Sequence, residues 1–370
     1  MNDCLIIGGG AIGLSIAYEL ARRGRRVALI DRSELGREAS WAGAGMLPPA
    51  NPRTARTAHD QLQALGGELH ARWAEELRAL TGIDAGYRRC GGIELARTQP
   101  DADALSRQAA EWQAQAIACE PLDAADLARL EPALCPAADA PILAAYRLRD
   151  QAQIRNPRYL KALVAACHRL GVEVHAGVEC TALQISGNRV AGATTNDGTL
   201  FAASYCIASG AWSGGLLRPF GVRVGVKPVR GQIVLFRAAA PPLSHVVCEG
   251  ARYLVPRDDG RLLVGSTMED VGFDTRNTTT AVQGLIDFAK SLVPSLANAT
   301  VERTWAGLRP GTTDGLPLIG PVPGMTNAFC AAGHLRGGLL LAPATAVVVG
   351  QMICGETPTI DVSAMRLDRD

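Results

Sequence analysis

The chain lacks an excess of charge of either sign. Its 370 residues include 37 lysines and arginines against 36 acids, which gives a net charge of +1. Proteins that bind nucleic acid or an anionic membrane surface need a concentrated positive field, and this composition supplies none. We therefore expect a small molecule as the partner, with no nucleic acid and no membrane.

Closely spaced cysteines and long hydrophobic runs are also missing. The two closest of the ten cysteines are 13 positions apart, so neither a disulfide framework nor a zinc site is indicated. The apolar stretch 339–354 contains Pro343 and is shorter than the roughly 20 residues of a membrane span, so we expect a buried helix packed on a sheet. The N-terminus lacks the basic segment of a secretory signal. These features predict a cytoplasmic protein whose cysteines are mostly reduced core thiols.

The size and composition predict an ordinary globular protein with two lobes. A chain of 370 residues exceeds the length that one hydrophobic core usually serves. The apolar fraction is 48% and the charged fraction 20%, which are typical of globular proteins. No repeats or low-complexity segments interrupt the chain.

A glycine-rich turn near the start has the context of a dinucleotide-binding motif. An apolar strand at 4–7 leads into Gly8, Gly10 and Gly13, and a helical pattern at 14–23 follows. Gly8 permits the tight turn, Gly10 lets the backbone approach a pyrophosphate, and Gly13 lets the helix pack closely on the strand. The phosphates would lie at the N-terminus of this helix.

A second strand completes a β-α-β unit. The apolar segment 26–30 ends in Asp31, which lies 21 positions after Gly10 and can accept hydrogen bonds from a ribose diol. The fingerprint fits NAD and FAD equally, and Asp31 disfavours a 2′-phosphate. A second glycine-rich segment at 333–338 suggests that both ends of the chain meet one long cofactor.

Hydrophobic periodicity predicts the remaining elements. Helices are expected at about 56–80, 101–118, 156–170 and 280–292, with Asn156 as the N-cap of the third. Strands are expected at 87–95, 172–175, 207–210 and 328–332. The strand at 207–210 ends in the small residues Ser209 and Gly210, which can approach a ribityl or pyrophosphate group closely.

Three segments carry a family resemblance that runs through residues 4–350. They are Ala-Gly-Met-Leu at 44–47, Trp-Ala-Gly-Leu-Arg-Pro-Gly-Thr at 305–312, and the run from Gly333 to Thr345. With these segments the chain resembles the FAD-dependent D-amino-acid oxidase superfamily and, within it, the glycine oxidases of thiamin biosynthesis. The resemblance implies a Rossmann-like FAD-binding lobe interleaved with an antiparallel-sheet substrate lobe, an α/β architecture like that of D-amino-acid oxidase and glutathione reductase.

The resemblance also implies domain boundaries and cofactor contacts. Residues 1–85, 145–222 and 306–370 would form the FAD-binding domain, and residues 86–144 and 223–305 the substrate-binding domain. The implied FAD contacts run from the pyrophosphate and ribose through adenine to the flavin: Gly8, Gly10, Ala11, Ile12, Gly13, Asp31, Arg32, Ala39, Ser40, Ala44, Gly45, Met46, Val178, His334, Leu335, Arg336, Gly337, Gly338, Leu339 and Leu340. We add Ser209 and Gly210 from the strand pattern.

The same resemblance assigns the substrate site to Arg309 and Tyr253, with Arg336 near the same cavity and Met268 as an apolar wall. An amino-acid carboxylate favours the planar, always-charged fork of an arginine, and a tyrosine adds a phenolic donor. One departure from glycine oxidases is Ala251, which stands where those enzymes carry a histidine two positions before the tyrosine.

The expected activity is oxidation of glycine, sarcosine or D-alanine by hydride transfer to FAD, with dioxygen as the electron acceptor. No cysteine occurs at 307–315, where covalent relatives attach flavin, so noncovalent FAD is expected. The alternatives are a D-amino-acid dehydrogenase that reduces a quinone, a noncatalytic FAD-binding subunit and, more remotely, an NAD dehydrogenase. Family members often form homo-oligomers, which the resemblance extends to this chain.

Overall fold

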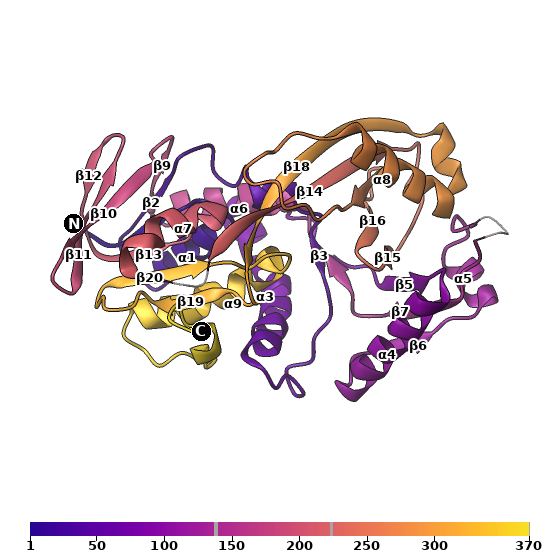
Figure 1. The fold of residues 1–370 in the computed structure, drawn as a ribbon, viewed down its shortest axis with the longest axis horizontal. Helices are drawn as coiled ribbons and strands as arrows, with labels where there is room; N and C mark the ends of the chain where they lie inside the picture. The colour runs from indigo at the N-terminus through magenta and orange to yellow at the C-terminus, as the bar shows by residue number, and fades with distance from the viewer. Residues whose placement is uncertain (137–139, 223–224, 370) are drawn as a thin grey trace.

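The computed structural model describes residues 1–136, 140–222 and 225–369, and the chain within them builds two large sheets joined side by side (Figure 1). The first sheet has six strands in the order β19-β20-β13-β1-β2-β9. All neighbours are parallel except β19 and β20. The bounds are β1 Asn2–Ile7, β2 Val27–Asp31, β9 Glu173–Ala176, β13 Ala202–Ile207, β19 Leu318–Pro321 and β20 Ala328–Ala332.

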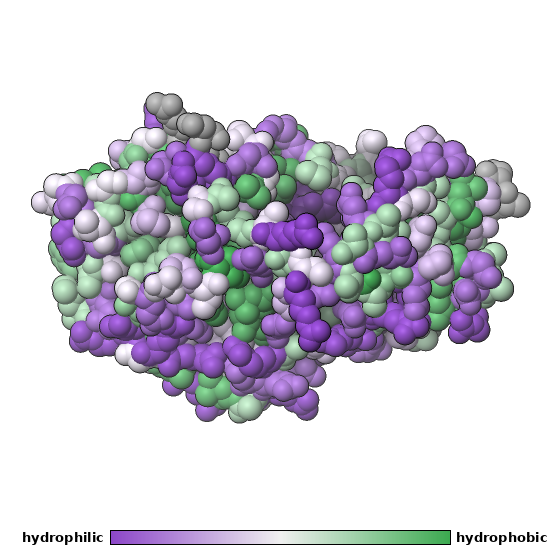
Figure 2. All heavy atoms as spheres, turned by 90° about the horizontal axis from the view of Figure 1, so that it is seen from below, coloured by the Kyte–Doolittle hydropathy of each residue, from purple (hydrophilic) through white to green (hydrophobic). Residues whose placement is uncertain are grey.

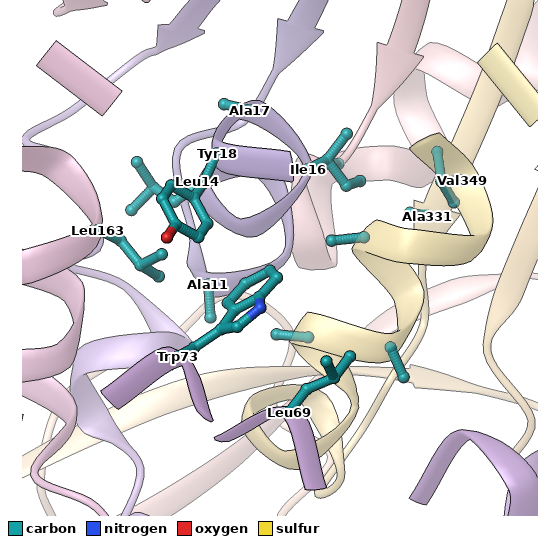
Figure 3. Close-up of a cluster of buried hydrophobic side chains, with 14 of the residues drawn as sticks. Ala11, Leu14, Ile16, Ala17, Tyr18, Leu69, Trp73, Leu163, Ala331 and Val349 are labelled. Carbon is teal, nitrogen blue, oxygen red and sulfur yellow. The ribbon is translucent and has the colours of Figure 1, made fainter. Parts of the chain in front are cut away.

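Four helices pack together around one face of this sheet. They are α1 (Ala11–Arg22), α3 (Ala58–Thr81), α6 (Asn156–Arg169) and α9 (Gly338–Ile353). Figure 3 shows the apolar side chains between them, with Trp73 of α3 lying edge-on to Tyr18 of α1 at a ring-centroid distance of 5.0 Å. The predicted β-α-β unit and the buried helix at 339–354 are thereby confirmed.

The second sheet has eight strands in the order β18-β14-β17-β16-β15-β5-β7-β6 and is largely antiparallel. Its bounds are β5 Gly92–Ala96, β6 Cys119–Pro121, β7 Ala144–Leu148, β14 Val226–Arg237, β15 Val246–Glu249, β16 Arg252–Pro256, β17 Arg261–Gly265 and β18 Thr300–Thr312. Helix α8 (Thr279–Leu292) covers it through Leu285, Phe288 and Leu292, which share a core with Val234 and Phe236.

Two three-stranded sheets, helix α4 and several shorter helices complete the described fold. The sheets are β3 (Met46–Leu47), β8 (Ala152–Gln153) and β4 (Arg88–Arg89), and β10 (Cys180–Ser186), β11 (Arg189–Thr195) and β12 (Gly198–Leu200). The other helices are α2 Ala39–Ala42, α4 Gln99–Ala114, α5 Ala124–Leu130, α7 Ser213–Leu217, η1 Gly210–Trp212, η2 Arg218–Phe220, η3 Pro294–Asn298 and η4 Ser363–Met365.

This arrangement confirms the predicted α/β fold class, with a Rossmann-like sheet beside an antiparallel one. The exact domain boundaries stay a prediction. Strand β7 extends past the expected boundary at 145 and β18 crosses the one at 306, while both pair within the second sheet. Residues 223 and 224, where the substrate domain is expected to resume, lie outside the described residues.

One finer prediction is wrong and another is confirmed. Asn156 is the first residue of α6 and Arg155 is its N-cap, because the Asn156 amide donates instead to the carbonyl of Ser40 at 2.9 Å. All ten cysteines are free thiols, as expected. Cys4, Cys167, Cys206 and Cys330 are buried, and Cys90, Cys180, Cys248 and Cys354 are partly buried and pack against the cores, so most are core thiols.

The outer surface mixes residue types. On the face shown in Figure 2, hydrophilic side chains surround smaller hydrophobic areas. Among the described residues no helix combines the length and apolar composition needed to cross a membrane.

Candidate FAD and substrate site

A cavity of about 550 Å³ connects the two large sheets and contains most of the predicted site residues. At one end it reaches Asp31, Arg32 and Val178. It continues past the turn after β1 and helix α2, and reaches Tyr253, Arg309 and the segment before α9 at the other end.

The turn after β1 fits its glycines closely. Gly8 has a φ of +116°, and a side chain there would meet the carbonyl of Ala208 at 2.4 Å. A side chain at Gly13 would meet the carbonyl of Gly8 at 1.8 Å, which explains why α1 can begin so near the strand. Gly10 is the N-cap of α1 and has no side chain to cap the helix, and the first turn contains no acid. The N–H of Ala11 donates to the Ser40 hydroxyl. The other N–H groups of this terminus and the helix dipole favour an anion in the cavity.

The Asp31 end of the cavity is organised by polar contacts. Asp31 accepts hydrogen bonds from the backbone N–H groups of Gly9 at 2.7 Å and Ser33 at 2.8 Å. The guanidinium of Arg32 stacks 3.7 Å from the ring centre of Trp212. The backbone N–H of Val178 donates to the carbonyl of Asp31. These contacts fix an acid and a stacked cation where the ribose contact is predicted.

The middle of the cavity is lined by small residues that other segments hold in place. Ser40 accepts a hydrogen bond from the N–H of Ala11 at 2.8 Å, which joins α2 to the start of α1. Asn156 fixes the Ser40 carbonyl, and its own Oδ1 is buried without a partner among the described residues. Because Asn156 lines the cavity, this oxygen is an acceptor available to a ligand, a role that the sequence pattern did not reveal.

Arg309 and Tyr253 meet at the other end of the cavity. Arg309 lies on β18, and its guanidinium donates to the Ser266 hydroxyl at 2.6 Å and the Thr267 carbonyl at 3.0 Å. Within the described residues no carboxylate pairs with it. Burial lowers the pKa of Arg309, and the charge of Arg336 acts in the same direction against the opposing effect of Tyr253. The site therefore holds a partly buried cation without an anion.

Two glycines make room for this pair, and the sequence analysis missed both. A side chain at Gly231 would lie 2.2 Å from the Arg309 guanidinium, and one at Gly265 would lie 2.5 Å from the Tyr253 ring. Both glycines lie on strands that neighbour those of their partners in the second sheet. Their role follows from cross-strand pairing, which local sequence does not display.

The remaining predicted residues are placed differently. Arg336 is exposed at the cavity edge, donates to the Ala251 carbonyl at 3.1 Å and lies 3.9 Å from the sulfur of Met268. Met268 is 52% exposed and outside the cavity lining. Three predicted cofactor residues also lie outside the lining, namely Gly13, Gly337 and Leu340.

The other predicted cofactor residues line the cavity as expected. They are Gly8, Gly10, Ala11, Ile12, Asp31, Arg32, Ala39, Ser40, Ala44, Gly45, Met46, Val178, Ser209, Gly210, His334, Leu335, Arg336, Gly338 and Leu339.

The start of α9 depends on a histidine from α3. Pro343 has no N–H, so the carbonyl of Leu339 lacks its helical donor. The Nε2 of buried His70 lies 2.8 Å from that carbonyl and donates to it. Burial lowers the pKa of His70 to about 4 and that of His334 to about 3, so both rings are neutral at pH 7.

We predict an acid-dependent loss of stability from His70. Its pKa is lower in the folded protein than in the unfolded chain, so the unfolded state binds the proton first and stability falls as the pH drops from about 6.5 to 4. Replacing the ring by His70→Gln keeps a donor and removes the titration. Between pH 7 and pH 5 the wild type should lose about 2 kcal/mol more unfolding free energy than the variant in denaturant titrations. Equal losses would contradict the buried neutral state.

Comparison with known proteins places this geometry in a family. The model of the family described as "FAD dependent oxidoreductase" matches residues 3–352. The glycine oxidase of Pseudomonas putida is 37% identical over 361 residues, which cover 97% of this chain and 96% of that protein. The bifunctional protein ThiO/ThiG of a Synechocystis species is 34% identical over 95% of this chain and 51% of its own length.

A solved structure agrees closely with the fold. The crystal structure of glycine oxidase from Geobacillus kaustophilus superposes with a TM-score of 0.94 and 34% identity, over 100% of this chain and 99% of that one. The family match spans both large sheets and every segment that lines the cavity. The chain therefore belongs to the FAD-dependent oxidoreductase family.

Proposed function

We propose that this protein binds FAD noncovalently and oxidises glycine and other small amino acids, including sarcosine and D-alanine. One amino acid and one dioxygen give the imine and hydrogen peroxide, and water then converts the imine to the 2-oxo acid and ammonia, or methylamine when the substrate is sarcosine. The observation that carries the proposal is the unpaired guanidinium of Arg309 beside Tyr253, inside a cavity that also contains a dinucleotide-binding turn.

The cavity fits FAD in several independent respects. Its anion-favouring helix terminus at Gly10 suits a pyrophosphate, and its length spans the segments from Asp31 to Leu339. The unpartnered Oδ1 of Asn156 offers an acceptor midway. The only cysteine among the described lining residues is Cys180, which follows Val178 closely and lies at the Asp31 end. This placement favours noncovalent binding.

The protein's own residues bind and orient the substrate. When bound, FAD supplies the hydride acceptor and passes electrons to dioxygen. Arg309 and Tyr253 would hold the carboxylate through charge-assisted hydrogen bonds and so fix the direction of the Cα–H bond. Arg336 would add a second positive charge at the cavity edge.

The charges also favour a neutral substrate amine. The acids that line the cavity are Asp31, Glu38 and Glu179, and all lie at the end opposite Arg309. With cations and no carboxylate nearby, the substrate ammonium is disfavoured and releases its proton to solvent on binding. The buried, neutral His334 does not add a further positive charge at pH 7.

The relatives support glycine as the substrate and dioxygen as the acceptor over the alternatives. Three relatives that match over nearly their full length are named glycine oxidase. The likeness to the bifunctional protein ThiO/ThiG supports a role in the thiazole branch of thiamin biosynthesis. Peroxide formation separates this activity from a quinone-linked dehydrogenase, and reduction of the flavin by glycine separates it from a noncatalytic subunit.

We also propose the domain division at 1–85, 145–222 and 306–370 against 86–144 and 223–305, a cytoplasmic location and a homo-oligomeric state. Ten free thiols support a reducing compartment. The oligomeric state is supported by the family resemblance alone.

Removing the substrate cation should reduce catalytic efficiency. In Arg309→Met the carboxylate loses charge-assisted hydrogen bonds of about 2–3 kcal/mol, so kcat/KM for glycine should fall roughly 30- to 150-fold in a peroxide assay. The matched control is Arg303→Met, a change on the same strand at an exposed position outside the cavity. An Arg309→Met enzyme with the efficiency of the control would contradict the assignment.

The clearance at Gly231 gives a second test. A methyl group in Gly231→Ala would overlap the Arg309 guanidinium and displace it from Ser266. We expect KM for glycine to rise at least about tenfold, the effect of losing roughly 1.4 kcal/mol of binding. The control Gly284→Ala places a methyl group in open space on α8 and should leave KM unchanged. An unchanged KM in Gly231→Ala would show that substrate binding does not depend on the place that the Arg309 guanidinium occupies beside Gly231.

A further inference from the structure

Arg257 is a buried arginine outside the cavity whose role the sequence motifs do not explain. It begins the turn between β16 and β17 and is 6% exposed. Its guanidinium reaches across to the segments that flank the cofactor cavity. It donates to the Ala44 carbonyl at 2.7 Å, to the Ile154 carbonyl at 3.2 Å and to Oε1 of Gln153 at 2.5 Å.

The electrostatics show that Arg257 is not held there by an ion pair. Its turn neighbours Asp258 and Asp259 form ion pairs with Arg88 and Arg155. No carboxylate among the described residues hydrogen-bonds to Arg257 itself. Burial lowers the pKa of Arg257 to about 9, and the adjacent Arg155 and Arg88 act in the same direction. A cation buried without an anion costs stability, and the three hydrogen bonds of Arg257 offset part of that cost.

The carbonyl of Ala44 is the contact that bears on the cofactor. A trans peptide directs its C=O and N–H to opposite sides. With the Ala44 carbonyl directed at Arg257, the N–H of Gly45 points away from the guanidinium. Gly45 lines the cavity, and its N–H has no acceptor among the described residues.

The surrounding backbone holds this peptide in one orientation. The carbonyl of Gly45 accepts a hydrogen bond from the N–H of Ile154 at 2.8 Å. Gly45 has a φ of +75°, and a side chain there would meet the Ile154 carbonyl at 2.0 Å. The next residue, Met46, pairs with Gln153 in the β3–β8 ladder. Arg257 therefore completes a framework that leaves the N–H of one cavity-lining residue, Gly45, without an acceptor among the described residues.

We propose that Arg257 is a positioning residue that orients and polarises the Ala44–Gly45 peptide, so that the N–H of Gly45 donates a hydrogen bond to bound FAD. This inference rests on the proposed binding of FAD. A guanidinium bonded to the carbonyl withdraws electron density from the peptide and strengthens its N–H as a donor. In this way the turn between β16 and β17 of the eight-stranded sheet orients the Gly45 N–H that contacts FAD.

The test compares Arg257→Met with Arg88→Met in the full-length protein. Arg88 contacts the same turn through Asp258 and the Pro256 carbonyl but does not reach Ala44, so it is the matched control. FAD binding to apoprotein is followed by quenching of FAD fluorescence, and the holoproteins are compared by visible absorption. Arg257→Met should raise the FAD Kd about tenfold or more and shift the flavin bands, while Arg88→Met stays within about twofold with an unshifted spectrum.

Thermal unfolding of the apoproteins separates this role from a structural one. Arg257→Met removes a costly unpaired charge but leaves the acceptors of Gln153, Ile154 and Ala44 without a donor, so it should melt somewhat below the wild type, and FAD binding is compared at a temperature at which both apoproteins are folded. If that variant does not fold, Arg257→Lys decides, because lysine keeps the charge and cannot reach all three acceptors. A spectral shift with weaker FAD binding in Arg257→Lys supports the proposal.

Wild-type FAD affinity and an unshifted spectrum in the folded Arg257 variant would overturn the proposal. The wild type provides the reference for the underlying function. If it binds FAD and glycine reduces it while the variants are unaltered, only the role of Arg257 fails. If the wild type itself binds no FAD, the proposed function fails with it.

Discussion

An arginine without an acid, held inside a cavity between two sheets, is the constraint on which the account of this protein depends. The Arg309 guanidinium donates to Ser266 and Thr267, and the residue lines the cavity beside Tyr253. A charge in this position is costly unless a ligand supplies an anion. Because Gly231 and Gly265 have no side chains, the neighbouring strands leave room for the Arg309 guanidinium and the Tyr253 ring.

In the part of the cavity assigned to the cofactor, backbone groups and not charged side chains are the main polar groups offered to a ligand. The terminus of α1 at Gly10, the Ala44–Gly45 peptide and the start of α9 all present main-chain atoms to the cavity. Each forms a hydrogen bond with a polar side chain of another element: Ser40, which also lines the cavity, bonds to Ala11, and His70, behind the lining, bonds to Leu339. Small residues line this part of the cavity, and polar side chains of other elements hold their backbone groups in place.

The sequence predicts the parts of the fold that depend on short-range pattern. Alternation and the glycine spacing are sufficient for the β-α-β unit from Asn2 to Asp31, and the apolar run is sufficient for α9. The Asn156 prediction is wrong because a cap preference is local, whereas its amide bonds to Ser40, 116 positions away. Arg257 and Gly231 are missed for the same reason: their partners come from other strands or segments. Tyr253 and Arg309 are identified by family resemblance, since neither is distinctive alone.

The most direct test is the visible spectrum of the purified holoprotein mixed with glycine in the absence of oxygen. We expect the flavin absorption to bleach as the substrate is oxidised, and admitted oxygen to restore it with hydrogen peroxide formed in proportion. Sarcosine and D-alanine, tested in the same way, rank the small amino acids. A bound flavin that glycine, sarcosine and D-alanine all fail to reduce would contradict the assignment of an amino-acid oxidase.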